Sequence, residues 1–350
     1  MKPKPYSLPL FNRYFCALSP PLMAQTPPSL DAEQPHDDHH HHHLGFPARS
    51  LCGESRAERA WAHWSKLGRP RFIVAPMVDN SELPFRMLCR KYGAQGAYTP
   101  MLHSRIFSET ETARKVEPYC DYVDINLGCP QRIAKRGNYG AFLMDNLPVV
   151  KSLRLVVMLL AVHGRTRDEK DGKKFRADWK AIRAVKNAVR IPVLANGNIR
   201  HMDDVRDCLE ETEVEGVLSA ETLLENPALF AGFRTAEWVS ESEGTNVDGK
   251  LDQADLLIEY LKLCEKYPVP WRMIRSHVHK LLGDWFSLQP HIREELNKQS
   301  KLTFEFLYDM VDRLRDTGTR IPLYKETRVE LTSDSYSDRL GCTPTFEAQS

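Results

Sequence analysis

The stretch Tyr122-Val-Asp-Ile-Asn126-Leu-Gly128-Cys129-Pro130 is a strand-forming run that ends in a turn bounded by glycine and proline. The basic, glycine-punctuated loop Lys135-Arg136-Gly-Asn-Tyr-Gly140 follows it closely. A thiol at the end of a strand and beside cationic charge is typical of a reactive cysteine. A free cysteine is, however, more often a small buried hydrophobe. Other features of the sequence are therefore needed to choose between these two interpretations of Cys129.

The same pattern, an apolar run followed by a polar or glycine-rich turn, recurs along the chain. It predicts six strands, at residues 72–77, 96–100, 122–127, 159–163, 191–195 and 216–220. Helical stretches lie between several of them, at residues 83–92, 179–189 and 202–211. Strands that alternate with helices form parallel βαβ units, and such turns suit the active face of a (β/α)8 barrel. We therefore expect an α/β protein of TIM-barrel type that lacks about two of its strands.

Composition changes divide the chain into five segments. We expect a disordered, low-complexity segment at 1–65, an α/β barrel at 66–236, a polar linker at 237–250, an all-α helical domain at 251–328 and a tail at 329–350. In the helical domain, Asp252 is a helix-capping residue, and three apolar stripes with helical spacing follow it. Gly318 is expected to end the third helix.

Composition also excludes several classes of protein. No apolar run approaches 20 residues, so neither a transmembrane helix nor a membrane partner is expected. Eight cysteines are scattered without a C-x-x-C pair, and nothing fixes the geometry of the run His39–His43, so no functional metal site is expected. Thiols without a secretory signal indicate a cytoplasmic protein. The nucleus is an alternative, and the basic, acid-poor first thirty residues leave an organelle as a further one. Either Met1 or Met23 can be the start.

The net charge of +1 hides a local asymmetry. Residues 130–190 contain fifteen Lys and Arg but only five Asp and Glu. Such an excess favours a polyanionic partner, of which nucleic acid is the commonest. The alternative, a set of solvated helix faces balanced by acids elsewhere, is equally compatible with the charge count.

Five separated motifs occur in a fixed order along residues 69–324. They are Ala75-Pro-Met-Val-Asp79, Asn126-Leu-Gly-Cys-Pro130, Val162-His-Gly-Arg-Thr166, Ala195-Asn-Gly-Asn-Ile199, and Ser219-Ala-Glu221 with Asn226-Pro227. Together they resemble the tRNA-dihydrouridine synthases, and most closely the branch that acts on uridines 16 and 17 of the D-loop. The loop 134–142 strengthens that assignment.

The resemblance implies a flavin-dependent reductase of tRNA. It implies an FMN-binding barrel, NADPH or NADH as the hydride source, a helical tRNA-binding domain, and a monomer without an obligate protein partner. Cys129 matches the family's proton donor to C5 of the uracil, and a thiol is mostly protonated at neutral pH. Asn126 is placed at the edge of the uracil, although it can equally tie the turn to the backbone.

The remaining site residues are carried over from the same motifs. Lys135, Arg136 and Arg165 are candidates for contact with the tRNA. The residues expected around FMN are Pro76, Met77, Val78, His163, Asn196, Gly197, Asn198, Ala220 and Glu221. For His163, a core histidine is the alternative interpretation.

The chain departs from the family pattern in two places. Between Thr99 and Tyr122 it lacks a strand that carries a flavin-contacting glutamine, and between Pro148 and Leu159 it lacks a strand that carries a lysine. Lys151 lies on what resembles the preceding helix, so the lysine's role is not transferred to it. Deletion of whole βα segments would explain both gaps and would leave strand edges open.

Two alternatives therefore stand beside the synthase. One is a catalytically impaired form that acts only as an RNA-binding protein, and the other is an FMN oxidoreductase for a free pyrimidine. The helical domain and the basic stretch argue against the second.

Overall fold

The computed structural model describes most of the two predicted folded regions. The described residues are 15–19, 55–103, 117–128, 132–137, 140–146, 148, 158–166, 168–169, 175–238, 251–318 and 320–325. Several predicted features lie outside them: Cys129, the run His39–His43, Lys151, most of the linker and the tail 329–350.

Five short parallel strands form the central sheet. Their order is β3-β2-β8-β7-β6, and their bounds are β2 Phe72–Val74, β3 Gly96–Ala97, β6 Leu160–His163, β7 Val193–Asn196 and β8 Gly216–Ser219. The pairing of β2, early in the chain, with β8, the last strand of this sheet, is the neighbourhood that a barrel requires. These five strands were all predicted from the sequence.

Alternate residues of the strands enter two different clusters, as the two-residue period of a strand requires. Ile73, Leu194 and Leu218 pack with Trp64 on the inner side of the sheet. Val74, Val193 and Val217 pack on the opposite side, in the large cluster beneath the helices. The sheet is thus buried on both faces, as is usual for parallel sheets.

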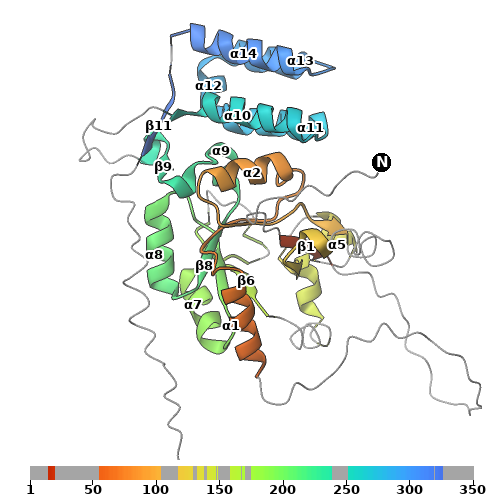
Figure 1. The fold of residues 1–350 in the computed structure, drawn as a ribbon, viewed down its shortest axis with the longest axis vertical. Coiled ribbons are helices and arrows are strands. Elements are labelled where there is room, and N and C mark those ends of the chain that lie inside the picture. Colours follow the sequence, from red (N-terminus) through yellow and green to blue (C-terminus); the bar gives the residue numbers. More distant parts are fainter. Residues whose placement is uncertain are drawn as a thin grey trace, which may run out of the picture.

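Helices cover the outer face of this sheet (Figure 1). They are α2 Leu83–Lys91, α7 Trp179–Ala188, α8 Met202–Thr212 and α9 Glu221–Glu225. Asp178 caps α7 by accepting a hydrogen bond from Ala181 N, and His201 caps α8 in the same way from Asp204 N.

The predicted end of the low-complexity segment, residue 65, is wrong. Helix α1 occupies Arg56–Lys66 and lies at the opposite end of the sheet from α10 and α11 (Figure 1). Ser55 and Glu58 form a reciprocal capping box, and Trp64 is 2% exposed because it closes the inner cluster. A strand, β1, also lies within the segment that was predicted to be disordered.

The sixth predicted strand belongs to a separate parallel sheet of order β4-β1-β5. Its strands are β1 Phe15–Ser19, β4 Leu102–His103 and β5 Tyr122–Ile125, and β5 is followed by α5 Arg132–Gly137. Among the described residues no ladder joins β5 to β3 or β6, so the barrel is not closed there. Residues 104–116 and 149–157, which contain most of the two predicted gaps, lie outside the described residues.

The second domain contains five helices in its described part. They are α10 Gln253–Lys266, α11 Trp271–Leu281, α12 Gly283–Leu288, α13 Pro290–Lys298 and α14 Phe304–Asp316. Asp252 caps α10 as predicted, whereas the second apolar stripe divides into α11 and α12 at Leu282. None of the described helices is long and apolar enough to cross a membrane.

The expectation of a purely α-helical domain needs correction. Three short strands form an antiparallel arrangement in which β11 lies between β9 and β10, with bounds β9 Phe233–Arg234, β10 Leu251–Asp252 and β11 Pro322–Lys325. The pairing returns the chain after α14 to the end of the barrel, because β9 immediately follows the last barrel helices.

The helical domain packs directly on the barrel. One continuous buried cluster includes Val74 and Phe85 of the barrel and Leu257 and Leu314 of the helical domain. Helix α10 lies against α2 (Figure 1), where Lys91 and Tyr92 both contact Glu259. The two predicted domains therefore share a core rather than depending on the linker alone.

Candidate functional site

A cavity of about 1740 Å³ opens at the carboxyl ends of the barrel strands. Ligand pockets usually measure roughly 300–1,000 Å³, so this one is large, in keeping with the lack of a ladder from β5 to β3 or β6 among the described residues. Eleven of the predicted site residues line it: Pro76, Met77, Val78, Asn126, His163, Arg165, Asn196, Gly197, Asn198, Ala220 and Glu221. Residues from five separate motifs thus meet in one cavity.

The turn after β7 has a backbone that few residues could adopt. Gly197 has φ 115°, and a Cβ there would lie 2.8 Å from the Cβ of Ala177. Asn198 has φ 63°, in the left-handed region that asparagine tolerates. Its Oδ1 accepts hydrogen bonds from Arg165 Nη2 at 2.6 Å and from Ala177 N. The turn is therefore fixed before any ligand binds.

This bonding changes the interpretation of Arg165. Its Nη2 is held by Asn198, and its Nε donates to Phe175 O at 2.8 Å. The guanidinium shapes the turn after β7, so a contact with RNA would have to use its remaining donors. For the Asn198 amide, the geometry favours a structural role and leaves ligand contact to the neighbouring backbone.

His163 stands at the end of β6 beside the same turn. Its Cε1 would lie 3.4 Å from a Cβ on Gly197, and its side chain is open to the cavity. Partial burial, with a further contribution from Arg165, lowers the pKa of His163. The ring is therefore neutral at pH 7 and can donate one hydrogen bond while it accepts another.

The turn after β8 is joined to the turn after β7. Ser219 Oγ donates to Ile199 O at 3.0 Å, and Ser219 is 3% exposed. Ala220 and Glu221 follow directly and line the cavity. The two turns contain glycine or alanine and follow adjacent parallel strands, so together they form a concave backbone surface. Backbone N–H groups on such surfaces commonly bind phosphate.

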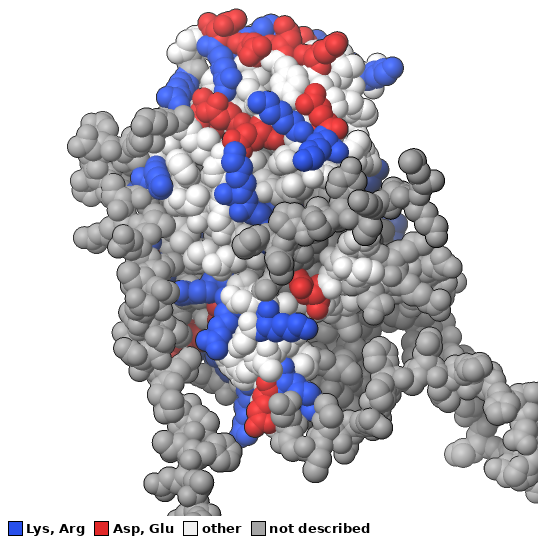
Figure 2. All heavy atoms as spheres, in the orientation of Figure 1, with Lys and Arg blue, Asp and Glu red and all other residues white. Residues whose placement is uncertain are grey.

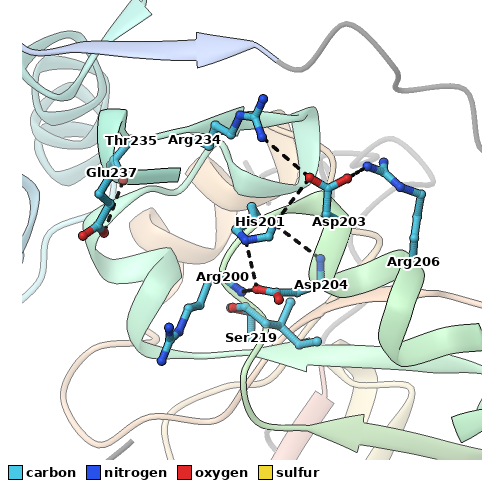
Figure 3. Close-up of polar contacts among 10 residues, drawn as sticks. Arg200, His201, Asp203, Asp204, Arg206, Ser219, Arg234, Thr235 and Glu237 are labelled. Atoms are coloured by element: carbon cyan, nitrogen blue, oxygen red, sulfur yellow. Dashed lines mark hydrogen bonds and ion pairs between the residues drawn. The ribbon is translucent and has the colours of Figure 1, made fainter. Parts of the chain in front are cut away.

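Arg200 is a cavity residue that sequence reasoning missed. It directly follows the Asn-Gly-Asn-Ile motif, and that adjacency was the available signal. Its backbone N donates to Asp204 Oδ2 at 2.8 Å, which fixes the start of α8. In Figure 3 the side chain of Arg200 extends away from Asp203 and Asp204. A cation thus stands at the rim beside both turns.

A charge network supports the start of α8 behind this rim (Figure 3). Asp203 contacts Arg206 and, at 3.6 Å, the buried Arg234. His201 Nδ1 accepts from Asp204 N at 3.4 Å. These contacts couple the β7 turn to the strand β9, which pairs with the chain after the helical domain.

The opposite wall of the cavity carries Asn126. Its Oδ1 accepts from Gly128 N at 2.8 Å, so the side chain does tie the turn that precedes Cys129. Its Nδ2 is directed at Met101 Sδ. The backbone role and the uracil role are compatible, because an amide oxygen has a second lone pair. Lys135 and Arg136 are exposed on α5 but are not among the residues that line the cavity.

A polar group at the base of β5 was also missed. Tyr122, Asp124 and Asn126 share one side of the strand by its two-residue period, which was the available signal. Tyr122 Oη donates to Tyr98 Oη at 3.2 Å, and both rings line the cavity. Burial raises the pKa of Asp124 to about 6. Because side chains from all the strands normally fill the interior of a barrel, this side of β5 could have been expected to contribute to it.

The basic stretch is only partly a free cationic surface. Arg183 pairs with Glu213 at 2.6 Å, and Lys186 pairs with Glu215, so acids of the neighbouring element offset part of the predicted excess. In Figure 2, acidic and basic side chains are intermixed over the helical domain at the top of the view. The balanced-helix interpretation therefore applies to α7.

The cations of α11 are likewise used in different ways. Arg272 is paired with Asp79, and Arg275 donates to Leu296 O and Gln299 O. Lys280 has no polar partner among the described residues, and it lines the cavity mouth. Of these three cations of α11, Lys280 has the best placement for contact with a phosphate.

Comparison with protein families gives a match to the dihydrouridine synthase (Dus) family. The match covers residues 73–115, 108–157 and 155–313. It is divided into three consecutive pieces, and the junctions fall within the two stretches where the expected strands are missing. The family pattern is thus interrupted at the places that the sequence predicted.

The individual proteins that are similar to this chain are named as tRNA-dihydrouridine synthases too. A "tRNA-dihydrouridine(16/17) synthase (NAD(P)(+))-like" protein of Rattus norvegicus is 37% identical over 305 residues, covering 68% of this chain and 66% of the relative. The corresponding synthase of Schizosaccharomyces pombe is 34% identical, covering 67% and 74%. A tRNA-dihydrouridine(20a/20b) synthase of the same yeast is 31% identical over 234 residues.

The chain spans just under two thirds of the rat relative's length. Because 68% of 350 residues is about 238, about 67 of the 305 aligned positions have no residue in this chain. That number is enough for two βα segments of ordinary size, each about 30 residues.

Proposed function

The chain belongs to the dihydrouridine synthase family, and from this premise we propose that it is an FMN- and NADPH-dependent tRNA-dihydrouridine synthase for positions 16 and 17 of the D-loop. The observation that carries the proposal is the meeting of all nine predicted flavin residues in one cavity. NADH can replace NADPH as the reductant, and the protein acts in the cytoplasm as a monomer.

The residues present fit FMN on its phosphate side. Gly197 and its fixed turn provide a surface that a side chain would obstruct, and Arg200 provides a cation at the rim. Met77 and Val78 provide an apolar wall for a flat ring, and Val78 is 49% exposed into the opening. Reduced FMN, when bound, supplies the hydride that adds to C6 of the uracil.

The remaining chemistry falls to the chain's own groups. Asn126 would orient the uracil edge, and Cys129 would deliver a proton to C5, which would neutralise the negative charge built up on the base. A uridine in folded tRNA must first be extracted, which costs a few kcal/mol. Phosphate contacts by Lys280, Lys135 and Arg136 offset that cost.

An assay on tRNA tests the proposal directly. Full-length protein with FMN, NADPH and unmodified tRNA should form dihydrouridine at positions 16 and 17. Cys129→Ala should leave flavin reduction intact and reduce product formation by about 100-fold, as loss of a general acid does. Product formation unchanged by Cys129→Ala would remove the thiol from the mechanism. Reduction of free uracil in preference to tRNA would favour the pyrimidine oxidoreductase.

The cofactor side has its own test. FMN and riboflavin differ only in the phosphate, so their relative affinity reports on the turns after β7 and β8. Arg200→Ala should weaken FMN by about tenfold and leave riboflavin unchanged, because a charge-assisted bond to the phosphate is lost. An equal loss of affinity for FMN and riboflavin would show that Arg200 does not contact the phosphate.

A second candidate function is RNA binding without catalysis. It is favoured by the interrupted family match and by the lack of a closed barrel among the described residues. Retained tRNA binding in a protein that binds no flavin would select this alternative.

A further inference from the structure

The loop after β2 is compact and stands at the cavity wall. Met77 N donates to Ser81 Oγ at 3.2 Å, and Ser81 Oγ donates to Met77 O at 3.1 Å. Asn80 Nδ2 donates to Val78 O at 3.0 Å. The loop thus folds on itself and presents Met77 and Val78 to the cavity.

Helix α11, from the other domain, holds the tip of this loop. Arg272 donates to both carboxylate oxygens of Asp79, from Nη2 at 2.9 Å and from Nε at 3.2 Å. Ser276 Oγ donates to Asn80 Oδ1 at 2.7 Å. Residues four apart lie on one face of a helix, so a single face of α11 holds two consecutive residues of the loop.

The base of the loop is held more deeply. Glu82, 5% exposed, accepts a hydrogen bond from Tyr260 Oη at 2.6 Å and lies 2.9 Å from His277 Nε2. Tyr260 and His277 are fully buried, and Phe85 stacks on the His277 ring at 4.5 Å. This buried group sets the position of α11 relative to the start of α2.

The tip is also in a backbone conformation that needs support. Asp79 has φ 56°, in the left-handed region that a non-glycine residue occupies only at an energetic cost. The hydrogen bond from Arg272 lowers the pKa of the Asp79 carboxyl, so the carboxylate is charged at neutral pH. Strained conformations persist when their surroundings hold them, and here α11 supplies the polar contacts.

We propose that Arg272 is a positioning residue through which the helical domain sets the flavin-side wall of the cavity. By holding Asp79, it fixes where Met77 and Val78 stand, so the domain that contacts RNA also shapes the surface on which the uracil and the flavin meet. The link to catalysis rests on the proposed function, whereas the hold of α11 on the loop does not. An exposed ion pair contributes little to global stability, yet it is large relative to the opening free energy of a single loop.

Amide hydrogen exchange in the full-length protein tests the hold itself. Arg272→Ala and Asp79→Asn should each speed exchange at residues 77–82 by roughly fivefold, with the melting temperature little changed. In Arg272→Lys the exchange rate at residues 77–82 should lie between those of these variants and the wild type. Lysine keeps the positive charge but lacks the planar guanidinium that donates two parallel hydrogen bonds. The double variant should be no faster than either single one, since both remove the same contact.

Lys262→Ala is the matched control. Lys262 is an exposed cation of α10 in the same domain, and it has no polar partner among the described residues. Its removal should leave exchange at 77–82 unchanged. Unchanged exchange in both Arg272→Ala and Asp79→Asn would overturn the proposal.

Kinetics provide the second arm. A positioning role predicts that Arg272→Ala lowers kcat and leaves the KM for tRNA nearly unchanged, whereas Lys280→Ala raises KM. A raised KM with unchanged kcat for Arg272→Ala would make Arg272 an RNA contact and would contradict positioning. If the wild type forms no dihydrouridine, the proposed function fails, and hydrogen exchange still decides whether α11 holds the loop.

Discussion

The two sides of the barrel differ in how much support the chain gives them. The β2–β8–β7–β6 side has an inner cluster closed by Trp64, an outer layer of helices and the helical domain packed above. On the other side, β5 pairs with β1, which pairs in turn with β4, and Val123 is 45% exposed.

This difference separates two parts of the proposed chemistry. The turns expected to hold a flavin phosphate follow β7 and β8, on the supported side. Asn126 and the candidate acid Cys129 follow β5, which no ladder joins to β3 or β6 among the described residues. Cofactor binding and proton delivery therefore depend on regions of unequal stability, and the first can survive loss of the second.

The largest expected effect compares the buried Trp64 on one side with the exposed Val123 on the other. Trp64→Ala should lower the free energy of unfolding by about 3–5 kcal/mol, because it empties the centre of the inner cluster. Val123→Ala should change it by less than about 0.5 kcal/mol. Chemical denaturation measures both. Similar losses from the two variants would show that the β5 side is as well packed as the other.

The next effect concerns the attachment of the helical domain. Tyr260→Phe removes a buried hydrogen bond to Glu82 and should cost about 1–3 kcal/mol. The control is Tyr308→Phe, which removes the exposed bond from Tyr308 to Glu265 and should cost less than about 0.5 kcal/mol. Equal costs would mean that the buried hydrogen bond from α10 to Glu82 does not anchor the helical domain to the barrel.

Asp124 gives a smaller, pH-dependent effect. Its folded-state pKa of about 6 lies above the usual value for aspartate, so the folded state retains the proton longer and stability falls as pH rises from about 4 to about 6. Asp124→Asn should be about 1 kcal/mol more stable than wild type at pH 7.5, after allowance for solvent screening, and equal to it near pH 4. Thermal melts at the two pH values decide. If Asp124→Asn were stabilised by the same amount at both pH values, the stabilisation would not come from titration of this carboxyl group.

The smallest effect lies on α7. Arg183→Ala removes a half-exposed pair with Glu213 and should cost at most about 0.5 kcal/mol, decreasing as salt is added. The same variant should leave tRNA affinity unchanged, because Arg183 is already neutralised. A marked loss of tRNA binding would instead show that α7 is part of the tRNA-binding surface.

The fold was predictable where local pattern and tertiary context agree. All six strands and the cap at Asp252 follow from periodicity and capping chemistry. Helix α1 was missed because it follows a long low-complexity stretch, although Ser55 and Glu58 formed a readable capping box. The strands β9 and β11 are too short to show periodicity, and their pairing is a tertiary property.

The site was predictable as a set of residues but not as a set of contacts. Motif order brought Gly197, His163 and Ala220 to one cavity. That Arg165 would bind Asn198, and that Arg272 would bind Asp79, depends on distances between elements far apart in the chain, and sequence spacing does not contain them.

We expect the supported side to hold a flavin although the described residues form no closed barrel. The most direct measurement is the visible spectrum of the purified full-length protein, titrated with FMN and passed through a desalting column. We expect retained absorption bands at about 375 and 450 nm, set by the cofactor's own chromophore. A protein that emerges colourless after FMN addition would contradict it.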